Sequence, residues 1–238
     1  MQAFLAILRY DADQLGRSWL VRIWVALLVA PAIFVVIVAA SEDELASETL
    51  AAYVAAVYTP LSAIAVSVLA VGAVSGEAAM IADSILSKSV TRTEYLSAKI
   101  VARLGITLGV HIAVMVPFAY LVVRYAAPDT SAGGVTVGLL MVASLLAFLA
   151  SMGIMLSTVS RNVLLEVLLL LVGIVISGVV LQFIGLTWMS ATAVLNELPA
   201  TFRGETPIWD EVRALGVFLI LSATAIFSSL WLFRRKDL

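Results

Sequence analysis

Residues 76–99, GEAAMIADSILSKSVTRTEYLSAK, form a charged segment in a sequence that is otherwise mostly apolar. The segment carries six charged side chains, whereas the long apolar runs before and after it carry none. Each run reaches the roughly 20 apolar residues that one helix needs to cross the hydrocarbon of a bilayer. Because backbone groups in lipid must be bonded within the chain, each run is predicted to be a helix. The segment therefore connects two predicted transmembrane helices.

The rest of the chain contains more runs of the same kind. The six predicted spans are 23–41, 49–76, 104–123, 130–160, 167–196 and 214–233. The composition agrees, since 63% of the 238 residues are hydrophobic and 13% are charged, against about half and a quarter in soluble domains. Short alternating segments, which are typical of a strand barrel, are absent from the sequence. We predict an all-α membrane protein with one domain, residues 1–238.

Composition and local pattern exclude several other classes. The chain has no cysteine, which excludes disulfides, thiol catalysis and cysteine-bound metals, and its net charge of −2 gives no argument for nucleic acid. The triplet VAA at 38–40 resembles a signal-peptide cleavage site, but the apolar run before it is too long. We therefore expect the first span to be retained.

Pro60 and Pro117 lie inside spans two and three, and both are expected to kink their helices.

The distribution of lysine and arginine predicts the orientation. Eleven of these residues fall on the side that holds both termini and segment 76–99, and three fall on the other side. The positive-inside rule places the richer side in the cytoplasm. We predict a multi-pass protein of the cell membrane with both termini cytoplasmic.

Residues 1–20 precede the first span but are patterned as a helix. Apolar residues recur at roughly helical spacing, with Asp11, Asp13 and Arg17 between them. These residues are Phe4, Leu5, Leu8, Leu15, Trp19 and Leu20. This pattern favours an amphipathic helix that lies in the cytoplasmic interface. The alternative is an extended start of the first span.

The residue pattern of the charged segment predicts a short helix, a turn and the start of a second helix. Met80, Ile81 and Ile85 share one side of the first helix, and Asp83 lies toward the other. The sequence TRTE at 91–94 fits a capping box, so the second helix should begin near Arg92. Two readings stay open at this point: a rigid docking element for a partner, or an ordinary connection whose charges hold the topology.

The segment also resembles the first cytoplasmic loop of the permease subunits of type-two ABC exporters. The matching residues are Glu77, Leu86, Ser87, Val90, Thr91, Arg92 and Lys99. The ending FRRKDL at 233–238 is similar to the usual ending of that family, whereas Ile81, Ala82 and Ser89 depart from its loop pattern.

The resemblance implies that 76–92 is a cytoplasmic coupling helix between spans two and three, bound by a separate ABC ATPase subunit. The implied contact residues are Glu77, Asp83, Ser84, Ser87, Lys88, Thr91 and Arg92. The sequence contains no phosphate-binding loop, so ATP and Mg²⁺ would be bound by the partner and this chain would hold no cofactor. The resemblance further implies a pair of permease chains, identical or related, and a partly re-entrant outer segment at 183–211.

Small residues in spans two and five are candidates for close helix contacts in such a pair. These residues are Ala55, Ala56, Ala63, Gly173 and Gly178.

Two polar residues inside spans need separate explanations. His111 is the only histidine, and we expect it to be hydrogen-bonded within the bundle rather than to bind a metal or act in catalysis. Glu166 lies five residues beyond Arg161, which is about 7 Å into the membrane for a helix. We expect it to form an ion pair with Arg103, because buried charges are costly unless paired. The alternative is a proton or cation relay, which would make the chain a secondary transporter or channel driven by an ion gradient.

Overall fold

The computed structural model describes residues 2–74, 91–160 and 162–235, and nearly all of them are helical. The helices are α1 (Gln2–Arg17), α2 (Trp19–Glu42), α3 (Ala46–Tyr53), η1 (Val54–Tyr58), α4 (Thr59–Val71), α6 (Arg92–Tyr125), α7 (Ala132–Val159), α8 (Val163–Phe183), η3 (Thr187–Met189), α9 (Ala191–Arg203) and α10 (Ile208–Arg235). Six helical stretches are long and apolar enough to cross a membrane: α2, α3 to α4 taken together, α6, α7, α8 and α10. The prediction of an all-α, multi-pass membrane protein with six spans is confirmed.

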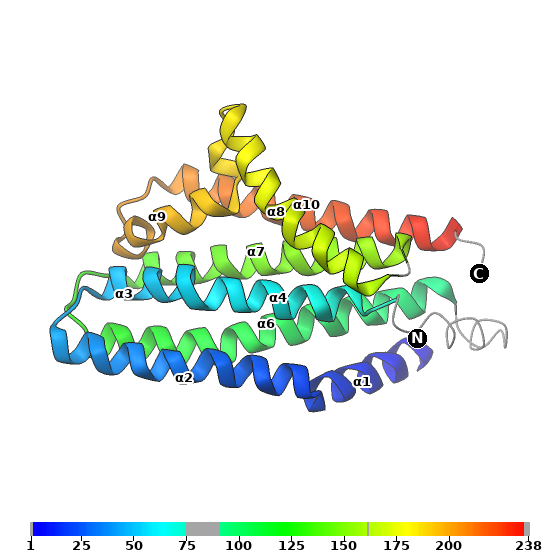
Figure 1. Ribbon diagram of the computed structural model, residues 1–238, viewed down its shortest axis with the longest axis horizontal. Helices are drawn as coiled ribbons and strands as arrows, with labels where there is room; N and C mark the ends of the chain where they lie inside the picture. The colour runs from blue at the N-terminus through cyan, green and yellow to red at the C-terminus, as the bar shows by residue number, and fades with distance from the viewer. Residues whose placement is uncertain (1, 75–90, 161, 236–238) are drawn as a thin grey trace.

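Helices α2, α4, α6, α7 and α10 run along one bundle axis, whereas α8 is inclined to it (Figure 1). Both termini and α1 lie at one end of the bundle, which we call the terminal end. The connections at 43–45, 126–131 and 204–207 lie at the other end, which we call the distal end. Helix α7 is central, because it contacts α4, α6, α8, α9 and α10.

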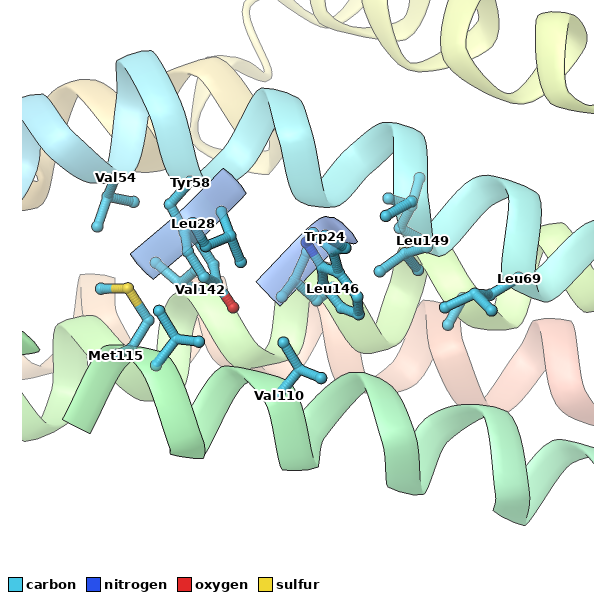
Figure 2. Packing of buried hydrophobic residues seen from close by; sticks show 14 of the residues in the cluster. Trp24, Leu28, Val54, Tyr58, Leu69, Val110, Met115, Val142, Leu146 and Leu149 are labelled. Carbon is cyan, nitrogen blue, oxygen red and sulfur yellow. The ribbon is translucent and has the colours of Figure 1, made fainter. Parts of the chain in front are cut away.

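The core lies where α2, α4, α6 and α7 meet (Figure 2). Trp24 and Leu28 of α2 point toward Tyr58 and toward Leu146 of α7, and all four side chains are buried. Two hydrogen bonds hold α2 in place: the Trp24 indole donates to Ser62 Oγ (3.2 Å), and the Tyr53 hydroxyl donates to the Leu28 carbonyl (2.8 Å). The polar ends of these large aromatic side chains are therefore satisfied inside the bundle.

The second span contains one wide helical turn. Residues Val54–Tyr58 form a π-helix, which ends with the Thr59 N–H bonded to the Val54 carbonyl. Pro60 follows directly and occupies the first turn of α4. Because proline has no N–H, the α-helical ladder is interrupted at this position, and the π turn is the local distortion that accommodates it. Pro117 lies inside α6, which continues unbroken from Arg92 to Tyr125.

The N-terminal segment is a helix of its own and not an extension of the first span. α1 ends at Arg17, and Ser18 caps α2 by accepting a hydrogen bond from the Val21 N–H (3.3 Å). α1 packs along α6. The position of α1 relative to a membrane surface stays a prediction.

The fifth span is shorter than the sequence suggests. The predicted span 167–196 covers most of α8, the short 3₁₀ helix η3 and the first residues of α9, because α8 ends at Phe183 and α9 begins at Ala191. Gly185 has φ = +78°, a conformation that glycine adopts without strain, and the chain turns there. Ser190 then caps α9 by accepting from the Ala193 N–H (3.1 Å). The apolar residues after Gly185 thus lengthen the apolar run in the sequence, but they do not belong to helix α8.

Candidate functional site

The start of α6 has the capping geometry that the sequence predicts. Thr91 Oγ1 accepts a hydrogen bond from the Glu94 N–H (3.2 Å), and Glu94 Oε2 accepts one from the Thr91 N–H (3.3 Å). These two bonds satisfy backbone donors that would otherwise have no partner at a helix start. The predicted capping box is confirmed, and it fixes where α6 begins within the charged segment.

The first turns of α6 also contact the end of α10. Arg92 Nη1 donates a hydrogen bond to the Arg234 carbonyl (3.3 Å), and the Tyr95 and Phe233 rings stack with their centroids 6.3 Å apart. Cationic side chains at the end of a helix satisfy its last carbonyl groups and interact favourably with its dipole. The start of α6 is therefore attached to the last turn of α10.

A buried charge cluster joins α1 to α6. Asp11 of α1 lies 2.7 Å from Lys99 Nζ and 3.9 Å from Arg103 Nη2, measured from its Oδ1 atom. Asp11, Lys99 and Arg103 are all at least nine-tenths buried. A carboxylate in such surroundings is tolerated only with opposite charge beside it. The cluster therefore holds α1 against the second and third turns of α6.

Arg103 has a partner that the sequence did not indicate. The fold of the N-terminal helix brings the Asp11 carboxylate to Arg103. The ion pair with Glu166 that we expected from the sequence stays a prediction. Sequence reasoning placed Asp11 on the polar side of α1. A signal for its burial was present, because Asp11 lies between Leu8 and Leu15 at helical spacing.

Glu166 lies in the first turn of α8 and is fully buried. Its helix packs against α4 and α7 at the terminal end. A carboxylate in the first turn is favoured by the positive end of the helix dipole. The structure therefore places Glu166 at the terminal end of α8, in its first turn.

The remaining predicted contact residues lie outside the described part of the chain. They are Glu77, Asp83, Ser84, Ser87 and Lys88, and their role stays a prediction. Of the predicted ATPase-contact residues, the structure places Thr91 and Arg92, both at the start of α6.

His111 is held by hydrogen bonds on both ring nitrogens. Nδ1 is 2.8 Å from the Tyr58 hydroxyl, and Nε2 is 3.1 Å from the Leu139 carbonyl oxygen. The π turn that precedes Pro60 ends at Tyr58, so this turn brings the hydroxyl to the ring. Within the described residues, no group of three or more histidine, aspartate or glutamate side chains is arranged to hold a metal ion. The geometry of His111 is that of a bonded core residue.

A second polar network ties the distal end together. Arg203 at the end of α9 donates to Ser47 Oγ (3.1 Å) and Glu205 (2.9 Å) and lies 3.8 Å from Glu48. The Ser47 N–H in turn donates to Asp129 Oδ1 (2.8 Å) in the connection before α7. The hydrogen bond with Glu205 holds the pKa of Arg203 above its ordinary value. Arg203 therefore links α9 to α3, and Ser47 links α3 to the connection before α7.

Comparison of the sequence with models of protein families and with curated proteins gives no match.

Proposed function

We propose that this chain is the transmembrane permease subunit of an ATP-driven ABC exporter, with the substrate pathway formed by a pair of such chains. In this proposal the terminal end faces the cytoplasm of a cell membrane. Separate ABC ATPase subunits bind segment 76–92, and they supply ATP and Mg²⁺. The chain itself carries out no enzymatic step.

The observation that carries the proposal is the anchoring of α6 at the terminal end. The capping box at Thr91 begins a single helix of 34 residues that runs to Tyr125 at the distal end. Arg92 ties its first turn to α10, and Lys99 ties its second turn to α1. A force applied to segment 76–92 would therefore act on three helices together. This is the arrangement that a mechanical coupling element requires, and an ordinary connection would not need it.

A second candidate rests on the buried carboxylate of Glu166. An ionisable group inside a membrane helix marks a proton or cation path in many transporters. The chain would then be a secondary transporter or channel that needs no ATPase. Glu166 lies near the terminal end of α8, at its first turn, and the second candidate would need further groups to carry the ion onward.

The test looks for an ABC ATPase gene beside the gene of this chain. It then co-expresses the two and measures co-purification and ATP hydrolysis in vesicles. The double variant Asp83→Lys, Arg92→Glu should reduce co-purification by about tenfold, the loss expected when close charge pairs across an interface are removed. The variant should still insert and keep its helical circular dichroism.

The matched control is Arg17→Glu, which reverses an exposed charge at the same end of the molecule. It should bind the ATPase as the unchanged chain does. Full binding and normal ATP hydrolysis by the double variant would refute the proposal. Proton uptake by vesicles that contain this chain alone, abolished by Glu166→Gln, would favour the secondary transporter.

A further inference from the structure

An apolar groove runs along the outside of the bundle between α6 and α7. Its volume is about 820 Å³, which is within the range of small-molecule sites. Ile112, Val116 and Tyr120 form one wall, and Leu140 belongs to the other. These four side chains are 49% to 67% exposed, so the groove is open to the surroundings of the bundle along its length. It is a lateral site on the membrane-facing surface and not part of the charge clusters described above.

The groove has a polar end. Ile112, Val116 and Tyr120 are spaced by four residues along α6 and line the groove. Arg124, which is not one of the lining residues, follows Tyr120 by about one helical turn. Arg124 is exposed, and no acidic side chain among the described residues forms an ion pair with it. Thr130 lies at the same end of the groove. The nearby Asp129 carboxylate accepts hydrogen bonds from Ser47, so it is bound to α3.

The dimensions of this surface fit one leaflet of a bilayer. From Ile112 to Arg124 the helix rises by about 18 Å, close to half of the roughly 30 Å hydrocarbon thickness. The apolar part therefore extends from near the bilayer centre to the distal interface. An aromatic side chain, Tyr120, precedes the cation by one turn, as is common where a helix leaves the hydrocarbon.

We propose that this groove is a binding site for one anionic phospholipid. An acyl chain lies against Ile112, Val116 and Leu140, and the phosphate group is bound by Arg124 with Thr130 beside it. The occupant is an amphiphile because the surface is apolar along one leaflet and cationic only at its end. The proposal does not depend on the exporter function.

A second copy of the chain fits the groove less well. In a pair related by a two-fold axis along the membrane normal, identical residues of the two copies lie at the same depth. Pairing through this groove would therefore bring two Arg124 side chains together at one interface, and like charges oppose such contact. An anionic headgroup has the complementary charge.

The test is native mass spectrometry of the full chain, purified in mild detergent with equal amounts of phosphatidylglycerol and phosphatidylcholine. The unchanged chain should retain one phosphatidylglycerol, preferred about fivefold, which corresponds to about 1 kcal/mol for one basic residue at a lipid surface. Arg124→Gln should remove the preference, and Arg124→Lys should keep most of it.

A second pair of variants separates the groove from general lipid contact. Val116→Trp fills the groove and should lower retention of both lipids, whereas Val175→Trp on the exposed face of α8 should not. Equal retention of the two lipids by the unchanged chain, or equal losses in both tryptophan variants, would overturn the proposal. Because the chain has no cysteine, Val116→Cys offers one more check. Efficient disulfide pairing of two Val116→Cys copies would show that a second chain covers the groove, and would also overturn it.

Discussion

Helices α7 and α8 are neighbours in sequence and similarly apolar, but the protein uses them in different ways. α7 has buried residues along its whole length, from Gly134 to Thr158. α8 has only two, Glu166 and Leu170, both near its terminal end. Beyond these residues α8 diverges from the bundle (Figure 1). Apolarity therefore predicts that a helix is in the membrane but not what it contacts there.

Glycine content does not separate the two helices either. A Cβ atom added at Gly138 of α7 would overlap the Phe202 ring, and one at Gly153 would lie 2.7 Å from the Ala70 Cβ. At Gly173 of α8 a Cβ would meet nothing within 4 Å. Gly138 and Gly153 thus mark close packing in α7, whereas Gly173 lies at an open surface of α8. The predicted use of Gly173 in contacts between copies is compatible with this exposure and stays a prediction.

The largest effect is expected from Gly134→Val in α7. The new Cβ would overlap the backbone carbonyl oxygens of Thr201 and Phe202, which cannot rotate away as side chains can. We expect a loss of about 3 kcal/mol in the free energy of unfolding, at the upper end for overpacked sites. The free energy of unfolding is measured by SDS titration in mixed micelles. The control Gly173→Val in α8 should change stability little, and an equal loss in both variants would abolish the contrast between the helices.

A smaller effect is expected where α8 does contact the bundle. Leu170 is buried, and its Cδ2 atom packs at Gly153 of α7. Leu170→Ala should lower the free energy of unfolding by about 2 kcal/mol, because a cavity remains at the contact. Leu169→Ala removes the same atoms from a half-exposed position and serves as the control. If both variants lose the same free energy of unfolding in this titration, the contact of Leu170 does not hold α8 against α7.

The smallest effect concerns the independence of the two buried charged sites. A double-mutant cycle of Glu166→Gln with Arg103→Gln tests the pair that the sequence predicts, and additivity within about 0.5 kcal/mol would rule that pair out. A cycle of Asp11→Asn with Arg103→Gln should show a coupling of about 1 kcal/mol, because these side chains belong to one cluster. Coupling between Glu166 and Arg103 would support the pair expected from the sequence. It would also mean that α8 is anchored to α6.

The parts of the fold that depend on short stretches were predictable. The six spans follow from hydropathy, and the capping box at Thr91 follows from two residues three positions apart. The end of α8 was missed because its signal is the backbone conformation of Gly185, and glycines also occur within the spans. The contact between Asp11 and Arg103 was missed for a different reason. An ion pair between α1 and α6 joins residues 92 positions apart, and it depends on how separate helices pack.

The π turn in the second span has a consequence for how this sequence can change. It holds one residue more than an α-helical turn would, so α3 and α4 are offset in phase by about 100° relative to a regular helix. Loss of a single residue between 54 and 58 would yield a regular helix with no break in its ladder before Pro60. That straight helix would rotate Leu50 and Tyr53, both now buried, out of the core. A deletion that looks harmless in an apolar run would therefore shift the register of the whole distal half of the span.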